Sequence, residues 1–231
     1  MLSLTNVNQF YGESHTLWDI NLEITPGSCI CLMGRNGVGK TTLLKTVMGL
    51  VPLQSGQITF DDIELSNQIA EFRSHVGIGY VPQGREIFPQ LTVQENLQIG
   101  LTSRKDKSRQ IPERIFELFP VLAQMLHRRG GDLSGGQQQQ LAIGRALASD
   151  PKILILDEPT EGIQPNIVQQ IGDIIIQLNQ QENLTVLLVE QKLPFARRVG
   201  KGFFILDRGR QVANGHMDEL NDDLVQRYLT V

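Results

Sequence analysis

The sequence predicts an α/β fold made of a parallel-sheet lobe, a small antiparallel β flank and an inserted helical subdomain. Two short apolar runs, residues 153–156 and 184–189, are typical of strands buried on both faces of a parallel sheet. Near the N-terminus apolar and polar residues alternate instead, as they do in half-buried antiparallel strands. Helical patterns fill the middle of the chain. We therefore expect one domain, with a core lobe at about 1–86 and 149–231 and a helical subdomain at about 87–148.

Five further runs predict strands, each bounded by turn residues or by a change of pattern. They are residues 2–7, 18–24, 28–33, 57–60 and 203–206. The first two alternate apolar and polar positions. Together with residues 57–60, which follow a turn at Ser55-Gly56, they make up the antiparallel flank.

Helices are expected where capping residues and helical periodicity coincide. Thr92 and Glu95 form a capping box that opens one helix, Ser134 caps a second, and Pro165 starts a third. The expected helices cover residues 41–48, a segment that begins at Thr92, residues 112–126, the segment from Ser134 to 148, and residues 165–181. The second, third and fourth of these lie in the expected helical subdomain.

One segment matches a phosphate-binding motif without a mismatch. Its residues are Gly34, Arg35, Asn36, Gly37, Val38, Gly39, Lys40 and Thr41, followed by Thr42. The glycines let consecutive backbone N–H groups turn toward phosphate oxygens, and the N-terminus of the following helix adds partial positive charge. Lys40 would reach the β and γ phosphates of ATP, and Thr41 would offer its hydroxyl to Mg²⁺.

Two acidic residues, Asp157 and Glu158, come directly after the buried run at residues 153–156. Open α/β sheets bind their ligands at the carboxyl ends of the strands. Asp157 is therefore expected to hold Mg²⁺ through water, and Glu158 to act as general base on the attacking water. The sequence thus predicts an ATPase.

A second anion site is expected at the helix that Ser134 caps. Gly135 and Gly136 leave its N-terminal amides uncovered, and Gln137 completes the segment Leu133-Ser134-Gly135-Gly136-Gln137. One ATP would bridge this helix and the phosphate loop if the two came from different subunits. The sequence alone equally allows both to serve one site within the same chain.

With these three motifs in this order, the chain resembles the nucleotide-binding subunit of ATP-binding cassette (ABC) transporters over essentially its whole length. The resemblance implies a P-loop NTPase core and two subunits that sandwich two ATP molecules head to tail. It also implies that Ser134, Gly136 and Gln137 contact the γ-phosphate of the partner's ATP. By the same resemblance Tyr11 stacks on adenine, and Gln83 senses Mg²⁺ and the attacking water. Taken as a lone aromatic residue, Tyr11 reads equally as a packing residue at a strand end.

Two positions depart from the family's pattern. Gln164 stands where many relatives have an acid, and Gln191 stands where the family usually has a histidine that touches the γ-phosphate. Gln191 still donates a hydrogen bond but carries no charge, and loss of one well-placed transition-state donor costs about 3 kcal/mol. We therefore expect slow turnover at this site, and a faster site in a partner ATPase that has the histidine.

Loop sequences narrow the resemblance to the ATPase subunits of urea and branched-chain amino acid importers. The segments at residues 80–92, 161–165 and 189–191 carry it, and Pro82-Gln83-Gly84-Arg85-Glu86 favours the urea branch over the amino acid branch. The implied partners are a second ATPase subunit, a transmembrane permease and, indirectly, a solute-binding protein. By resemblance residues 84–91 dock the permease, although their composition fits an ordinary surface loop equally well.

Composition agrees with a compact cytoplasmic subunit, and the resemblance implies a place at the cytoplasmic face of the inner (plasma) membrane, attached through the permease. The formal charge of −4 gives no basic excess to suggest a nucleic-acid partner. No run approaches the about 18 apolar residues of a membrane span, and residues 1–10 lack the features of a secretory signal. Cys29 and Cys31 are expected to be buried thiols rather than a metal or redox pair.

Two other classes of function stay open. One is an ABC ATPase that serves DNA repair, translation or cluster assembly, although the chain has neither long coiled coils nor two cassettes. The other is a nucleotide-gated regulatory module without turnover, which Gln164 and Gln191 favour and intact Lys40, Asp157 and Glu158 oppose.

Overall fold

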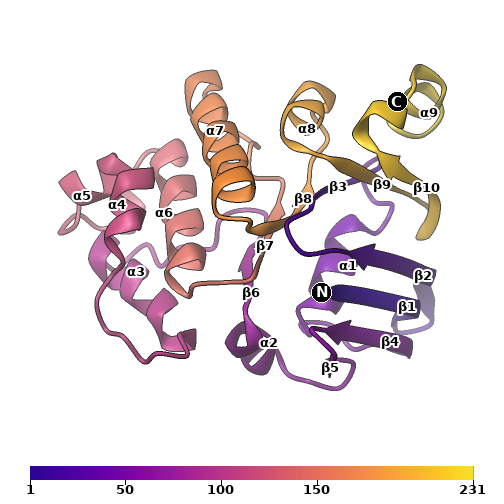
Figure 1. Ribbon diagram of the computed structural model, residues 1–231, viewed down its shortest axis with the longest axis horizontal. Coiled ribbons are helices and arrows are strands. Elements are labelled where there is room, and N and C mark those ends of the chain that lie inside the picture. The colour runs from indigo at the N-terminus through magenta and orange to yellow at the C-terminus, as the bar shows by residue number, and fades with distance from the viewer. Residues whose placement is uncertain (231) are drawn as a thin grey trace.

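Two β-sheets organise the computed structural model, which describes residues 1–230 (Figure 1). The antiparallel sheet has the order β2-β1-β4-β5 and contains β1 (Leu2–Tyr11), β2 (Ser14–Ile24), β4 (Ser55–Phe60) and β5 (Ile63–Glu64). The second sheet has the order β10-β9-β3-β8-β7-β6. Its strands are β3 (Cys29–Met33), β6 (Ile78–Val81), β7 (Ile153–Asp157), β8 (Thr185–Val189), β9 (Gly202–Asp207) and β10 (Arg210–His216). Its neighbours pair in parallel except for β10, which runs antiparallel to β9.

The helices fall into two groups. Those between β6 and β7 lie together at one end of the molecule, and the others pack around the sheets (Figure 1). In chain order they are α1 (Lys40–Val47), α2 (Ala70–Val76), α3 (Val93–Gly100), α4 (Glu113–Leu118), α5 (Pro120–Gln124), α6 (Gly135–Ala148), α7 (Pro165–Gln181), α8 (Leu193–Val199) and α9 (Asp222–Tyr228). Short 3-10 turns cover Leu101–Ser103, Gly130–Asp132 and Met217–Glu219.

The parallel sheet is covered on both faces. Every residue of β7 and of β8 is buried, as the unbroken apolar run at residues 153–156 predicted for β7. On one face, Leu43 and Leu44 of α1 share a core with the antiparallel sheet. On the other face, residues of α6, α7 and α8 form a second core that also holds Cys29 and Cys31. Both cysteines are buried free thiols, and burial raises the pKa of Cys29 to about 12.

Two helices begin at the capping residues that the sequence predicts, and both starts are capping boxes, of which only the one at Thr92 was predicted. At α3 the Thr92 hydroxyl accepts from the Glu95 N–H at 3.2 Å, and Glu95 accepts the Thr92 N–H at 2.7 Å. At α6 the Ser134 hydroxyl accepts from the Gln137 N–H at 3.4 Å, and Gln137 accepts the Ser134 N–H at 2.9 Å. Each reciprocal pair satisfies two helix-terminal donors, which fixes where the helix starts.

The expected helix over residues 112–126 is wrong in its extent, because the structure divides it into α4 and α5. The break lies at Phe119, whose φ of −130° and ψ of 71° are not helical. Pro120 explains it, since proline has no N–H to donate and disfavours helical geometry in the residue before it. The elements α2, β5, β6, α8, β10 and α9 were not predicted.

A buried arginine holds the C-terminal end of α1. Arg73 on α2 is 2% exposed, and its guanidinium donates to backbone carbonyls of four residues. These are Thr46 at 3.0 Å, Val47 at 2.7 Å, Leu65 at 2.6 Å and Gln68 at 2.9 Å. The last carbonyls of a helix have no partner within the helix, so Arg73 satisfies acceptors that burial would otherwise leave unpaired. It thereby fixes the direction of α1.

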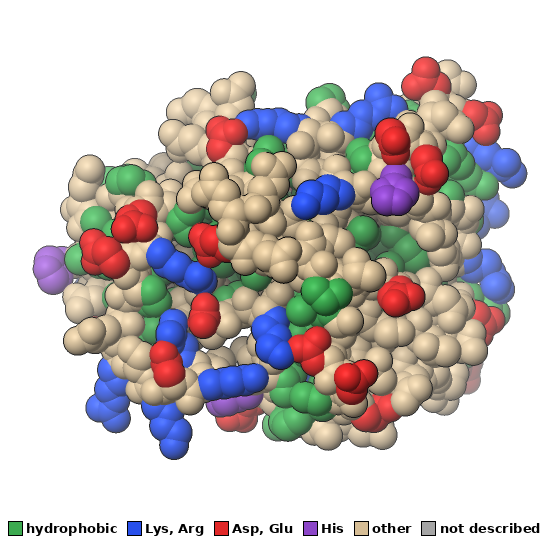
Figure 2. All heavy atoms as spheres, viewed as in Figure 1, with side chains coloured by type: hydrophobic (Ala, Val, Ile, Leu, Met, Phe, Trp, Pro, Cys, Tyr) green, Lys and Arg blue, Asp and Glu red, His purple; other side chains and the backbone are tan. Residues whose placement is uncertain are grey.

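Among residues 1–230, no helix is both long and apolar enough to cross a bilayer. On the face drawn in Figure 2, basic and acidic side chains are interspersed, in keeping with the modest formal charge of −4.

Candidate nucleotide site

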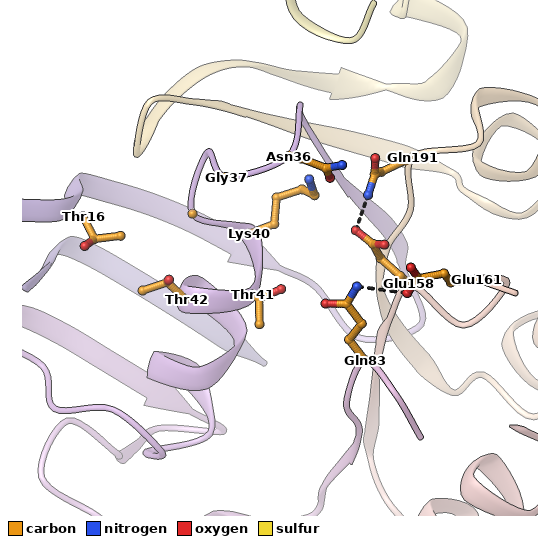
Figure 3. Close-up of a pocket in the computed structure, with 11 residues that line it drawn as sticks. Thr16, Asn36, Gly37, Lys40, Thr41, Thr42, Gln83, Glu158, Glu161 and Gln191 are labelled. Carbon is orange, nitrogen blue, oxygen red and sulfur yellow. Dashed lines mark hydrogen bonds between the residues drawn. The ribbon is translucent and has the colours of Figure 1, made fainter. Parts of the chain in front are cut away.

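A cavity of about 380 Å³ opens at the carboxyl edge of the parallel sheet, where the loops after β3, β6, β7 and β8 meet. Figure 3 shows Lys40, Thr41 and Thr42 facing Gln83, Glu158 and Gln191 across it. The complete lining is Thr16, Asn36, Gly37, Gly39, Lys40, Thr41, Thr42, Gln83, Glu158, Glu161 and Gln191. Loops from four strands therefore converge on one polar space large enough for a phosphate chain.

The loop between β3 and α1 needs glycine at two positions. Gly34 has a φ of 142°, and a Cβ there would lie 2.3 Å from the carbonyl oxygen of Leu206. Gly39 has a φ of 108° and is the N-cap of α1. Both conformations are unfavourable for residues with a side chain. Glycine at these two positions therefore lets the loop approach the start of the helix closely. The N–H groups at the N-terminus of α1 make this end of the cavity suited to anions.

Lys40 is 5% exposed, and its ammonium lies inside the phosphate loop. The Nζ atom donates to the carbonyl oxygens of Gly34 at 2.7 Å and Arg35 at 2.8 Å. Burial lowers the pKa of Lys40, and the nearby carboxylates of Glu158 and Asp157 oppose this effect. A cation held at this depth, beside a helix N-terminus, suits a doubly charged phosphate group.

Asp157 is the last residue of β7 and is 1% exposed. Among residues 1–230, neither of its carboxylate oxygens has a hydrogen-bond partner. Burial raises the pKa of this carboxyl to about 6, although the neighbouring Thr41 hydroxyl and Lys40 ammonium oppose part of this effect. A buried carboxylate without partners is costly unless something compensates it, and Mg²⁺ is a hard cation that prefers such oxygens. Together with the Thr41 hydroxyl, the donor set therefore fits Mg²⁺.

Glu158 and Gln191 form a pair across the loops after β7 and β8. The Gln191 Nε2 atom donates to Glu158 Oε1 (Figure 3), and the Glu158 N–H donates to the Val189 carbonyl at 3.0 Å. Glu158 has a φ of 48°, which is uncommon for a residue with a side chain. This backbone conformation turns its carboxylate into the cavity, where it can accept a proton from water.

A second pair joins the loop after β6 to the loop after β7. The Gln83 Nε2 atom donates to Glu161 Oε2 at 2.9 Å, and both side chains line the cavity (Figure 3). The sequence analysis did not select Glu161 as a site residue. The amide oxygen of Gln83 stays free to face a cation, because the amide uses its nitrogen in this contact.

The segment at the start of α6 lines a different cavity, of about 570 Å³. Its lining is Val121, Ser134, Gly135, Gly136, Gln137, Gln140, Gly162, Gln164, Ile167 and Gln170. The two cavities share no lining residue, although neighbouring Glu161 and Gly162 line one each. Within one chain, then, the two anion sites do not form a single pocket.

Several predicted site residues lie outside the first cavity's lining. Gly34, Arg35 and Val38 shape the phosphate loop, and Asp157 lies beneath the cavity at the end of β7. Tyr11 ends β1 with 48% of its surface exposed. Thr16 on β2 lines the cavity but was not predicted, because no sequence pattern relates it to the phosphate loop.

The chain matches a known protein family and several curated proteins. The profile of the family described as ABC transporter matches residues 17–161. The high-affinity branched-chain amino acid transport ATP-binding protein BraG of Pseudomonas aeruginosa is 42% identical, over 92% of this chain and 91% of that protein. The probable branched-chain amino acid transport ATP-binding protein LivF of Archaeoglobus fulgidus is 37% identical, over 95% and 94%. The glutamate/aspartate import ATP-binding protein GltL of Escherichia coli is 35% identical, over 96% and 94%.

Solved structures agree on the fold. A dimeric ATP-binding cassette in a post-hydrolysis state, bound to ADP and phosphate, superposes with a TM-score of 0.84 at 27% identity, covering 94% of this chain and 99% of that one. A cassette of an ABC transporter in its ADP conformation gives a TM-score of 0.83 at 26% identity, covering 98% and 97%.

Proposed function

Because the chain belongs to the ABC transporter family as an ATP-binding subunit that hydrolyses ATP, we propose that it powers an importer of branched-chain amino acids. The observation that carries the proposal is the 42% identity to BraG across 92% of this chain. GltL, the glutamate/aspartate import protein, is less similar, at 35%, which supports branched-chain amino acids over acidic ones as the solute.

Urea is the second candidate solute. From the sequence it was the first candidate, because the segment Pro82-Gln83-Gly84-Arg85-Glu86 favours the urea branch. The relatives named above are amino acid transporters, so they favour the alternative. Uptake assays with cells that lack this gene separate the two, because loss of labelled leucine uptake with urea uptake intact supports the first candidate and the reverse supports the second.

The cavity geometry supports specific roles for its residues. Lys40 and the N–H groups of the phosphate loop would hold the β and γ phosphates, and Asp157, Thr41 and Gln83 would hold Mg²⁺. Mg²⁺ bound with the nucleotide would neutralise charge that develops on the phosphate oxygens.

Two further side chains would act on the attacking water. Glu158 would accept its proton, and Gln191 would orient Glu158 and donate toward the γ-phosphate. Gln191 carries no charge, so we expect this site to turn over more slowly than a site with histidine at that position. Tyr11 would stack on adenine. Its place at the exposed end of β1 leaves its ring accessible to a base.

The second cavity supports assembly as a dimer. One ATP-binding cassette with the same fold is dimeric in two solved structures, and another is part of an ABC transporter complex. In our proposal Ser134, Gly136 and Gln137 contact an ATP held by the partner subunit, because in this chain they line a cavity separate from Lys40. We propose a different ATPase as that partner. Equal hydrolysis at both sites of the reconstituted pair would contradict this.

The remaining partners follow from the same proposal. A core lobe at 1–86 and 149–231 would hold the nucleotide. The helical subdomain at 87–148 would carry Ser134, Gly136 and Gln137 toward the partner's ATP. The segment 84–91 spans the boundary between these two parts and exposes Phe88. We propose that a transmembrane permease docks on this segment. A solute-binding protein would act indirectly, through the permease. By docking on the permease, this chain would lie at the cytoplasmic face of the membrane.

Steady-state ATPase activity tests the proposal. We expect activity mainly in the complex with partner ATPase and permease, and stimulation by binding protein loaded with leucine. Lys40→Ala should weaken nucleotide binding, and Glu158→Gln should bind ATP but release no phosphate. If the chain alone hydrolyses ATP robustly and ignores the permease, the soluble-ATPase alternative is favoured. If Glu158→Gln changes nothing in a complex that binds ATP, the regulatory-module alternative is favoured.

A further inference from the structure

One buried carboxylate lies directly behind the candidate site. Glu190 follows β8 and is 3% exposed. Its side chain accepts hydrogen bonds from three groups. The Thr160 hydroxyl lies 2.9 Å from Oε2 and 3.1 Å from Oε1, the Lys192 N–H lies 3.0 Å from Oε1, and the Gln191 N–H lies 3.2 Å from Oε1. Buried carboxylates are rare in proteins unless hydrogen-bond donors surround their oxygens, as they do here.

These contacts join two loops that contribute different site residues. Thr160 belongs to the loop after β7, two residues beyond Glu158, and Gln191 belongs to the loop after β8. The loops are joined a second time, because the Lys192 ammonium donates to the Thr160 carbonyl at 2.9 Å. A closed set of contacts through Thr160, Glu190 and Lys192 therefore fixes one loop against the other.

We propose that Glu190 is a positioning residue, which holds Gln191 and Glu158 in register so that the Gln191 amide reaches the Glu158 carboxylate. The inference rests on the proposed roles of Glu158 and Gln191 in ATP hydrolysis. Glu190 itself does not line the nucleotide cavity, so it acts through Gln191 rather than on the substrate.

The chemistry of the contacts distinguishes two substitutions. Glu190→Gln keeps an oxygen for the two backbone N–H groups, and its amide nitrogen can donate to the Thr160 hydroxyl, whose proton can rotate away. Glu190→Ala leaves the two N–H groups and the hydroxyl without this acceptor. Position rather than charge is what Glu190 supplies, so glutamine should largely replace it and alanine should not.

A double-mutant cycle tests the proposal in the assembled, ATP-hydrolysing complex, with kcat and KM for Mg-ATP as readouts. Misplacing a catalytic group by about 1 Å costs on the order of 10²-fold. We expect Glu190→Ala to lower kcat by roughly 10- to 100-fold with KM changed less than about 3-fold. Glu190→Gln should stay within about 3-fold of wild type. In a Gln191→Ala background, Glu190→Ala should lower kcat by less than about 2-fold further, because its target is gone.

Two more variants keep the test decisive. Thr160→Val removes one partner of Glu190 with little change in shape, so it should lower kcat in the same Gln191-dependent manner even if Glu190→Ala fails to fold. Thr185→Val is the matched control. Thr185 is buried at the opposite end of β8 and accepts the Gly27 N–H at 2.9 Å, so its loss should lower stability without a selective effect on kcat.

The outcomes separate this inference from the proposed function. If the effects of Glu190→Ala and Gln191→Ala on kcat multiply, or if Glu190→Gln is as impaired as Glu190→Ala, Glu190 does not position Gln191. If Glu158→Gln leaves phosphate release intact, the proposed catalytic role of Glu158 fails, and the inference fails with it.

Discussion

Replacing Asp157 with asparagine should make the nucleotide-free protein more stable above about pH 6, although Asp157 is central to the candidate site. Burial raises the pKa of the Asp157 carboxyl from 3.8 to about 6, and neither carboxylate oxygen has a hydrogen-bond partner among residues 1–230. The difference between these pKa values corresponds to roughly 3 kcal/mol. The free energy of unfolding is therefore lower by roughly 3 kcal/mol when Asp157 is ionised than when it is protonated.

The pH range of the effect follows from which state holds the proton. Between about pH 4 and 6 the folded protein keeps Asp157 protonated while the unfolded chain has released the proton, so rising pH lowers the free energy of unfolding. The Asp157→Asn variant lacks this titration. We expect the two proteins to approach equal stability near pH 4 and to differ by roughly 3 kcal/mol at pH 8, with the variant the more stable. Guanidinium chloride unfolding across this range, followed by circular dichroism, measures the difference.

Two controls sharpen the measurement. Asp207 also ends a strand, β9, but is only partly buried, so Asp207→Asn should give no comparable gain in stability. With Mg-ATP present the order should change, because the wild-type protein gains binding free energy that the Asp157→Asn variant has lost. A stability difference that does not vary with pH, or a wild-type protein that is the more stable at pH 8 without nucleotide, would refute the reasoning.

Two other substitutions test parts of the fold that serve the site. Arg73→Met should lower the free energy of unfolding by about 3 kcal/mol, because it leaves the carbonyls of Val47 and Gln68 without a donor and removes one of two donors from those of Thr46 and Leu65. Arg114→Met is the control, because Arg114 forms only partly exposed ion pairs with Asp150 and Glu182. It should cost less than about 1 kcal/mol in the same denaturation assay. Ser134→Ala should cost about 1 kcal/mol by removing the α6 cap, and should lower ATPase activity of the assembled dimer without weakening nucleotide binding to the isolated chain. Weaker binding to the isolated chain would place Ser134 at that chain's own nucleotide.

Local signals predicted the parts of this fold that local chemistry decides. Thr92 was identified as a helix start because its capping box lies within four residues, and Ser134 because serine is a preferred N-cap residue. The runs that became β7 and β8 were identified because strands covered on both faces cannot alternate. The phosphate loop was identified because its glycine positions are fixed by backbone geometry, as the φ of 142° at Gly34 illustrates.

The sequence did not reveal some other features, one because a local signal was misread and the rest because they depend on contacts between distant segments. The break at Phe119 had a local signal in Pro120, and it was missed because apolar periodicity on both sides was read as continuous. Thr16 and Glu161 reach the cavity only because β2 and the loop after β7 approach the phosphate loop in space. The burial of Glu190 was likewise invisible, because a Glu-Gln pair after a strand reads as an exposed loop until Thr160 is brought against it.

The order of strands in the parallel sheet explains why these residues work together. Since β8 lies between β3 and β7, the loop that carries Gln191 emerges between the phosphate loop and Glu158. Gln191 can therefore face both, whereas a side chain after β6 or β9 would be two strands further from one of them. The same order buries Glu190 beneath the junction of the loops, where a single carboxylate can bind both. If this is why Glu190 is buried, a change that weakens the pairing of β7 with β8 should reduce the contributions of Gln191 and Glu158 to kcat together. A change that weakens the pairing of β9 with β10 should leave both contributions intact.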